Sequence, residues 1–249
     1  MRPTTFENNS PAGEIAGQLN ARERAVLVDA VAGSQTKPQV VLEVGTWLGG
    51  GSTVHLLRAL QGNGAGHLWG VEADPSIYER MVANLRRAAP EAVHRFTPLF
   101  GLSQRVIPEW LAAQAPGFQI DVAFLDGGNN PLEQITEFRL IDPFMPVGAR
   151  LLSHDAKLRK GKWLVPYVSR LDNWESELLD ISAEGLFSAR KVEAHASPKS
   201  QQAAEAKLRR LRLQPAELAA RILPHWLRKK ALICLPGGLS RRLSDGRSA

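Results

Sequence analysis

Acidic residues stand at the ends of four apolar segments that have the length of buried strands: Glu43, Glu72, Asp126 and Asp155. In open parallel sheets the carboxyl ends of the strands lie at one edge, where ligands bind. Carboxylates there can accept hydrogen bonds from ribose hydroxyls or hold a cation, although a single one is as often a helix cap. His154 precedes the last of them, and a neutral imidazole near pH 7 can remove a proton from a hydroxyl group.

A glycine-rich turn follows the first of these strands. Residues 40–53 have the sequence Val-Val-Leu-Glu-Val-Gly-Thr-Trp-Leu-Gly-Gly-Gly-Ser-Thr, and an apolar helical pattern begins at Val54. A strand, a glycine turn and a helix open a nucleotide-binding βαβ unit, in which glycine lets the backbone approach a ligand. The dinucleotide fingerprint G-x-G-x-x-G does not fit, because Trp47 stands two residues after Gly45. Glu72, at the end of the next strand, is then the candidate for binding ribose hydroxyls.

Strands and helices alternate along the rest of this segment. Further strands are predicted at residues 66–74, 94–99, 120–126 and 149–155, and helices at 54–60, 75–88, 101–111, 131–144 and 165–171. Asp74 is expected to be the N-cap of the helix at 75–88. Residues 175–181 and 186–192 predict a hairpin. The fold class is therefore α/β: a Rossmann-like, mostly parallel seven-stranded sheet with helices on both faces and a C-terminal antiparallel hairpin.

Charge and composition divide the chain into three segments. We expect a helical lead-in at 1–37, with its helix at 21–31, and a ligand-binding domain at 38–193. A basic helical or disordered tail is expected at 194–249, with helices at 203–213 and 215–223. Residues 1–193 hold 19 Lys/Arg and 22 Asp/Glu, a net charge of −3, whereas residues 194–249 hold 12 and 3, a net charge of +9. The overall charge of +6 therefore belongs to the tail, and so do arguments about anionic partners.

Several motifs resemble those of one enzyme family. Residues 101–111, Gly-Leu-Ser-Gln-Arg-Val-Ile-Pro-Glu-Trp-Leu, are similar to a segment of catechol O-methyltransferases, as are Leu-Glu-Val-Gly-Thr at 42–46, Gly-Val-Glu-Ala-Asp-Pro at 70–75 and Val-Ala-Phe-Leu-Asp at 122–126. The chain from about residue 38 to 192 therefore resembles a class I methyltransferase that uses S-adenosylmethionine (SAM). The resemblance implies that Ser103 and Gln104 lie against the adenine and that Glu72 holds the ribose. It also implies a methionine site formed by Glu43, Gly45, Thr46, Gly49 and Ser52, with Asp126 beside the cofactor. The glycine turn is one residue longer than the family pattern.

The catalytic centre departs from the same family. Catechol-type enzymes hold a divalent cation with an acid after the fourth strand and an Asp-Asn pair after the fifth, which correspond to Asp126, Asp155 and Ala156. Because Ala156 has no side-chain oxygen and Mg²⁺ prefers six oxygen ligands, the resemblance implies at most weak binding of Mg²⁺ by Asp126 and Asp155. Asn129 replaces the lysine base of the family. We therefore expect His154 to act as the general base, together with Asp155 and Asp126, as in related sugar-modifying methyltransferases.

These residues favour a SAM-dependent methyltransferase, with O-methylation of a hydroxyl on a small molecule, sugar or lipid-linked glycan as the first hypothesis. One alternative is an RNA or protein methyltransferase that the basic tail recruits to its substrate. Another is a catalytically weak SAM-binding module, because the lysine base and one metal ligand are replaced.

The tail and the absence of targeting signals bear on partners and location. Trp226, Leu227 and residues 232–235 accompany Arg228 and the lysines that follow it, a pattern that fits peripheral contact with an anionic membrane. A solvated or packed helical appendage is the alternative, and nucleic acid is a weaker one, because aromatic residues are not interleaved with the basic ones. The N-terminus lacks the apolar core of a signal peptide and no apolar run is long enough to span a bilayer, so we expect a cytoplasmic protein.

Overall fold

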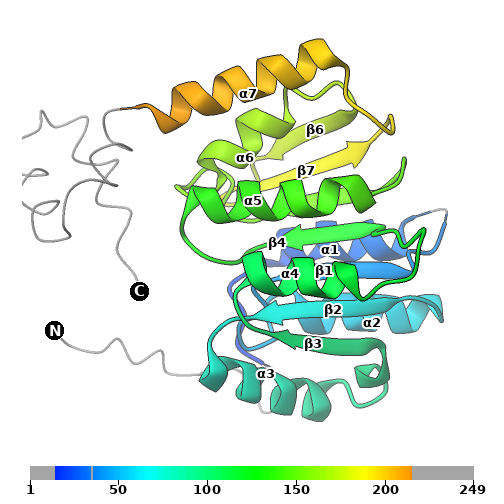
Figure 1. Ribbon diagram of the computed structural model, residues 1–249. Helices are drawn as coiled ribbons and strands as arrows, with labels where there is room; N and C mark the ends of the chain where they lie inside the picture. The colour runs from blue at the N-terminus through cyan, green and yellow to red at the C-terminus, as the bar shows by residue number, and fades with distance from the viewer. Residues whose placement is uncertain (1–14, 35, 215–249) are drawn as a thin grey trace, which may run out of the picture.

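The computed structural model describes residues 15–34 and 36–214. Its elements, in chain order, are α1 (Ala21–Ala32), β1 (Val40–Val44), α2 (Thr53–Asn63), β2 (His67–Glu72), α3 (Pro75–Ala88), the 3-10 helix η1 (Val93–Arg95), β3 (Phe96–Phe100), α4 (Ser103–Ala112), β4 (Val122–Leu125), α5 (Pro131–Ile141), η2 (Asp142–Phe144), β5 (Arg150–Ser153), α6 (Gly161–Val168), β6 (Trp174–Leu179), β7 (Leu186–Lys191) and α7 (Pro198–Arg212) (Figure 1).

The seven strands form one sheet in the order β3-β2-β1-β4-β5-β7-β6. Neighbours from β3 to β5 are parallel, and β7 pairs antiparallel with both β5 and β6. The strand order reverses direction between β1 and β4, which is the place where open α/β sheets bind their ligands. The predicted fold class, including the seven strands and the closing hairpin, is confirmed.

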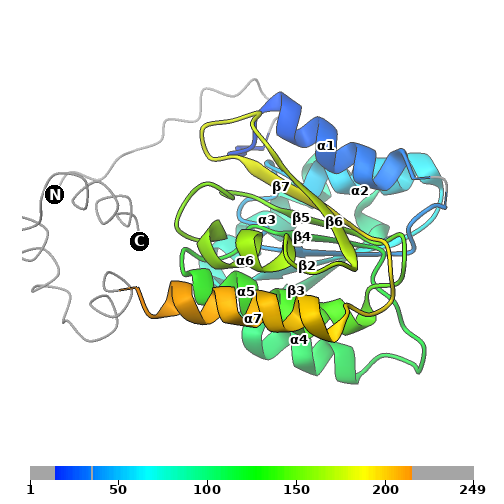
Figure 2. The ribbon, with the colours of Figure 1, turned by 90° about the horizontal axis from the view of Figure 1, so that it is seen from above.

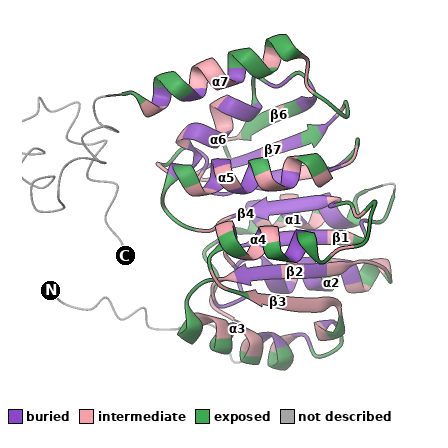
Figure 3. Cartoon of the chain, in the orientation of Figure 1, coloured by how far each residue is buried: buried purple, intermediate pink, exposed green. Residues whose placement is uncertain are grey.

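Helices cover both faces of the sheet and give it two apolar layers. Side chains of α1, α2 and α3 form one core with the strands, and those of α4, α5, α6 and α7 form the other. Figure 2 shows α1 and α2 on one side of the sheet and α4, α5 and α7 on the opposite side. The central strands β1 and β4 are buried on both faces (Figure 3), as expected for parallel strands between two helical layers.

Short polar motifs begin the helices that follow the strands. The Asp74 carboxylate accepts hydrogen bonds from the backbone N–H groups of Ser76 and Ile77, which confirms the predicted N-cap. Pro75 occupies the first turn, where its missing N–H group removes no helical hydrogen bond. Local sequence thus fixes the point where the chain leaves β2 and turns away from the carboxyl edge.

Two helices begin earlier than the sequence pattern predicted. Helix α7 begins at Pro198, not at 203, because the Ser197 side chain accepts a hydrogen bond from the Ser200 N–H and caps it. Helix α6 begins at Gly161, not at 165, and contains Pro166 in its interior. Proline usually marks a helix start, so its position in the sequence pointed to a later beginning.

The helix at the start of the predicted tail packs on the domain. Ala204, Leu208 and Leu211 of α7 are buried against the layer that α6 belongs to. Packed structure therefore continues beyond residue 193, where the sequence analysis had drawn the boundary of the domain. Likewise α1, in the predicted lead-in, buries Leu27 and Val31 completely beside α2.

Several predicted segments lie outside the residues that the structure describes. These are the start of the lead-in, the helix at 215–223, the cationic and apolar segment at 226–235 and the closing run of the tail. Within residues 15–34 and 36–214, no helix has the length and apolar character needed to cross a membrane.

Candidate active site

A cavity of about 340 Å³ opens at the carboxyl ends of β1, β2 and β4. Six of the predicted site residues line it: Gly45, Glu72, Ser103, Gln104, Asp126 and Asp155. They come from four strand ends and from the first turn of α4, so the βα repeat brings together residues that are up to 110 positions apart. Three of the four strand-end acids, Glu72, Asp126 and Asp155, thus line one cavity, whereas Glu43 does not.

Glu72 fastens the glycine turn to the end of β2. Its Oε2 accepts a hydrogen bond of 2.9 Å from the Trp47 N–H, and its Oε1 accepts bonds from the N–H groups of Ala73 and Asp74. Trp47 itself has a φ of 45°, an uncommon conformation for a residue other than glycine. The carboxylate is thus held in place at the cavity wall, and its proposed contact with ribose stays a prediction.

Four residues predicted to surround the methionine end do not line the cavity: Glu43, Thr46, Gly49 and Ser52. Glu43 is completely buried beneath the turn, where the Ser52 hydroxyl donates a hydrogen bond to it. Burial raises the pKa of Glu43 to about 8, since the charged form loses its hydration there. Their part in cofactor binding stays a prediction, and the geometry favours support of the turn from below.

The extra glycine of the turn has a steric explanation. A Cβ at Gly50 would lie 2.2 Å from the carbonyl oxygen of Ile15 and 2.3 Å from that of Ala16, closer than atoms approach. The chain before α1 therefore crosses directly over the turn. Gln18, in the same crossing segment, contributes to the cavity wall. Nothing in the local sequence indicated this contact, because it joins segments separated by more than thirty residues.

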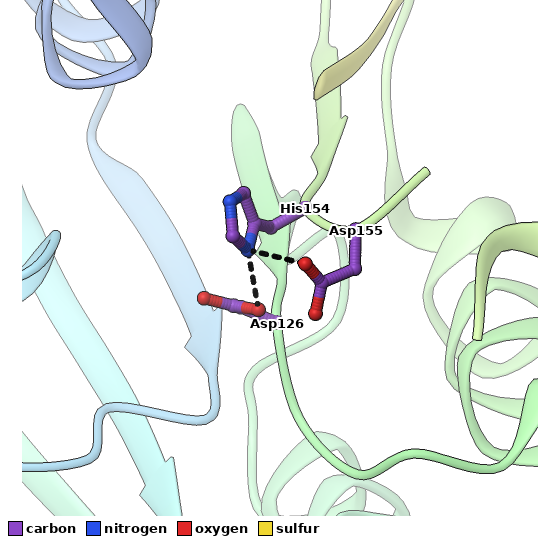
Figure 4. A group of neighbouring side chains, drawn as sticks. All are labelled: Asp126, His154 and Asp155. Atoms are coloured by element: carbon purple, nitrogen blue, oxygen red, sulfur yellow. Dashed lines mark hydrogen bonds and ion pairs between the residues drawn. The ribbon is translucent and has the colours of Figure 1, made fainter. Parts of the chain in front are cut away.

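His154 is buried between carboxylates (Figure 4). Its Nδ1 lies 3.2 Å from Asp126 Oδ1 and 3.3 Å from Asp155 Oδ1, and its Nε2 lies 3.2 Å from Glu23 Oε1. Burial opposes a charge on the ring, but the hydrogen bond to Asp126 and the charges of Asp155 and Glu23 outweigh it and raise the pKa of His154 to about 9. A raised pKa favours the protonated ring, which cannot accept a proton, so the role of His154 as a neutral general base stays a prediction.

Lys160, which the sequence analysis did not single out, lies among the same acids. Its ammonium Nζ is 2.6 Å from Asp126 Oδ1, 2.8 Å from Asp155 Oδ2 and 3.2 Å from the carbonyl oxygen of Asp126. Burial opposes ionisation of Asp126, but the Lys160 ammonium and His154 hold the pKa of Asp126 below its usual value. The residue was missed because its basic neighbours in the sequence are typical of a solvated loop.

The donor set does not fit a divalent cation. Asp126, His154 and Asp155 offer ligand atoms within 4.8 Å of one another, which is close enough for a metal site. However, Lys160 already bridges the two carboxylates. Ala156, at the third expected position, is buried and has no oxygen on its side chain. A metal ion would have to displace the ammonium.

Glu137 is a further buried acid in the cavity wall. Ser103 Oγ donates a hydrogen bond to Glu137 Oε1, and Gln104 Nε2 lies 2.8 Å from Ser103 Oγ. Glu137 Oε2 has no hydrogen-bond partner among the described residues, and burial raises the pKa of this group to about 7. The burial of Glu137 could have been predicted from the sequence, because this residue falls on the same apolar face of the helix as Phe138 and Ile141.

Comparisons with known proteins agree with this geometry. Residues 42–156 match a family model described as a methyltransferase domain. A putative O-methyltransferase from Klebsiella pneumoniae is 20% identical, with a TM-score of 0.58 over 73% of this chain and 84% of that one. The O-methyltransferase TomG from Streptomyces achromogenes, solved with SAM, is 18% identical, with a TM-score of 0.57 over 71% and 82%. An O-methyltransferase from Bacillus cereus, solved with SAH, is 18% identical, with a TM-score of 0.53 over 73% and 84%. Among curated protein sequences, none matches.

Proposed function

The chain has a class I methyltransferase domain, and from that premise we propose that it is an enzyme that transfers the methyl group of SAM to a hydroxyl group of a small molecule. The observation that carries the proposal is the cavity where the strand order reverses. Its wall includes Gly45 of the glycine turn and the acids Glu72, Asp126 and Asp155.

The residues of the cavity fit a nucleoside cofactor. Glu72 lies at the end of β2, where a carboxylate can accept both ribose hydroxyls. Ser103, Gln104 and Glu137 form a polar set at the wall made by α4 and α5, and Glu137 keeps one oxygen without a partner in the described part of the chain. When bound, SAM supplies a methyl group already activated by a sulfonium centre.

The acceptor hydroxyl belongs at the end of the cavity formed by Asp126, Asp155 and Lys160. The protein's share of the work there is alignment of the acceptor and removal of its proton. The carboxylates of Asp126 and Asp155 are the groups placed to take that proton, because the pKa of His154 is raised to about 9. A sugar or a lipid-linked glycan fits the same chemistry, since each presents hydroxyl groups.

Calorimetry with S-adenosylhomocysteine tests the cofactor, and transfer of a labelled methyl group to a panel of hydroxylated acceptors tests the reaction. Glu72→Ala should weaken cofactor binding strongly, because it removes the ribose acceptor and releases the Trp47 N–H. Glu79→Ala is the control, because Glu79 lies exposed on the helix that follows. Binding of NAD without binding of S-adenosylhomocysteine would refute the proposal.

The basic segment at 226–235 lies outside the described residues, and for it we keep the proposal of peripheral contact with an anionic membrane from a cytoplasmic location. Each Lys or Arg near such a surface contributes about 1 kcal/mol. In a sedimentation assay at low salt, the protein should pellet with anionic vesicles and should not pellet with neutral vesicles. Equal sedimentation with both, or salt-sensitive binding of RNA alone, would contradict it.

A further inference from the structure

The Lys160 ammonium is a fully engaged cation at the acceptor end of the cavity. Only 6% of its side chain is exposed, yet the residue contributes to the cavity wall. Its three nearest oxygens are a carboxylate oxygen of Asp126, one of Asp155 and the carbonyl oxygen of Asp126. Two carboxylates on neighbouring strands are thus bridged by one positive charge, an arrangement in which a metal ion usually holds such a pair.

The fold positions this lysine through close packing of small residues. A Cβ at Gly161 would lie 2.4 Å from the carbonyl oxygen of Ala156 and 2.6 Å from its Cα, so only glycine allows the start of α6 to approach the end of β5. Asp155 has a φ of 54°, a left-handed conformation that aspartate tolerates better than most residues. These two features turn the chain back on itself after β5. Lys160, five residues after Asp155, therefore faces the Asp155 carboxylate.

We propose that the Lys160 ammonium takes the place of a divalent cation in this active site and holds the carboxylates of Asp126 and Asp155 in position beside the acceptor. The backbone of Ala156 is part of the same arrangement, because it lies against Gly161. The acceptor half of this inference rests on the proposed function. The inference that Lys160 replaces a metal ion depends only on the contacts of Lys160.

Binding of Mn²⁺, measured by calorimetry and by its electron paramagnetic resonance, tests the inference without any turnover. The wild-type protein should bind no Mn²⁺ at the acceptor site. Lys160→Met removes the charge and nearly keeps the shape, and it should create one site per chain that binds at least about tenfold more tightly than the wild type. Lys157→Met is the matched control. That lysine pairs with Asp180 in the hairpin region outside the cavity, so no Mn²⁺ site should form.

Loss of one partner from a buried ion cluster destabilises a fold, so Lys160→Met is also prepared in the presence of Mn²⁺. A variant that melts at a higher temperature with Mn²⁺ than without it supports the inference. A folded variant that binds no Mn²⁺ overturns it. So does a wild-type protein that binds one Mn²⁺ and loses it on Asp155→Asn.

Turnover gives a second readout for the acceptor half. Chelation should leave wild-type turnover unchanged, and Lys160→Met should lower turnover while binding of S-adenosylhomocysteine is kept. If S-adenosylhomocysteine does not bind the wild type, the proposed function fails, whereas the Mn²⁺ results still decide the role of Lys160.

Discussion

At the scale of single residues, the carboxyl groups of Glu43 and Glu137 stand out because they are buried beside the cavity without an ion pair among the described residues. Burial raises the pKa of Glu43 to about 8 and that of Glu137 to about 7, from an ordinary value of 4.5. The folded state therefore keeps these protons at a pH where the unfolded chain has lost them. Their contribution to stability is complete below pH 4.5 and is lost as the pH rises through 7 and 8.

Glu43→Gln should remove most of this pH dependence. The amide keeps the shape of the carboxyl group and cannot ionise, so the variant should gain stability relative to the wild type as the pH rises from 6 to 9. Since each unit of pKa shift corresponds to about 1.4 kcal/mol, the gain is on the order of a few kcal/mol. Urea unfolding at a series of pH values measures it, with the exposed Glu79→Gln as control. Parallel curves for Glu43→Gln and the wild type would contradict the prediction.

His154 should titrate with a pKa near 9, because Asp126, Asp155 and Glu23 surround its ring. Ring ¹⁵N chemical shifts measure this directly, and Glu23→Gln should lower the value by removing one of the charges. His67 provides an internal control in the same spectra, because burial and the charge of Arg95 lower its pKa below 6.5. A His154 that titrates near 6.5 would restore the general-base hypothesis.

At the scale of elements, α1 contacts the end of β5 through Glu23 and His154. Asn20 and Glu23 form a capping box at its N-terminus, with Glu23 Oε2 bonded to the Asn20 N–H. The other oxygen of the same carboxylate faces His154 Nε2. One side chain thus begins a helix and orients the ring behind Asp126. A capping box is readable in sequence, but its contact with His154, 131 residues away, is not.

Gly50→Ala should displace the segment that crosses the glycine turn. The added Cβ would meet two backbone carbonyl oxygens, which cannot move aside as a flexible side chain can. Because Gln18 in that segment contributes to the cavity wall, affinity for S-adenosylhomocysteine in calorimetry should fall. Gly62→Ala is the control. It has open space in α2 and should stabilise the protein by roughly 0.5–1 kcal/mol without changing affinity. Unchanged affinity in Gly50→Ala would show that the crossing segment has no part in the site.

Leu208→Ala should destabilise the domain, because Leu208 joins α7 to the core beside α6. Truncation of a buried leucine costs about 2–5 kcal/mol, which chemical denaturation can measure. Leu213→Ala, at the exposed end of the same helix, is the matched control and should cost less than about 0.5 kcal/mol. Equal, small effects would mean that α7 is not part of the cooperative unit, and the original boundary at residue 193 would then stand.

At the scale of the whole molecule, periodic pattern and local caps were enough to predict the fold, but only part of the site. Apolar runs that end in acids predicted the strands, and Asp74 followed by Pro75 predicted the start of α3. The edge where Glu72, Asp126 and Asp155 meet follows from parallel pairing alone. Lys160, Glu23 and Glu137 could not be predicted in their roles, because each acts through packing between distant segments. The contact between the start of α6 and the end of β5 cannot be predicted from the spacing of residues in the sequence.

The position of β7 has a consequence for how the protein is made. Because β7 lies between β5 and β6, the strand that completes the sheet is the last one to leave the ribosome. During synthesis of the residues between β5 and Lys191, the edge of β5 has no neighbouring strand, and an open edge can pair with another nascent chain. Closure of the sheet therefore waits until β7 (Leu186–Lys191) has left the ribosome. Each molecule passes through an interval in which translation speed and chaperone contact decide between folding and aggregation.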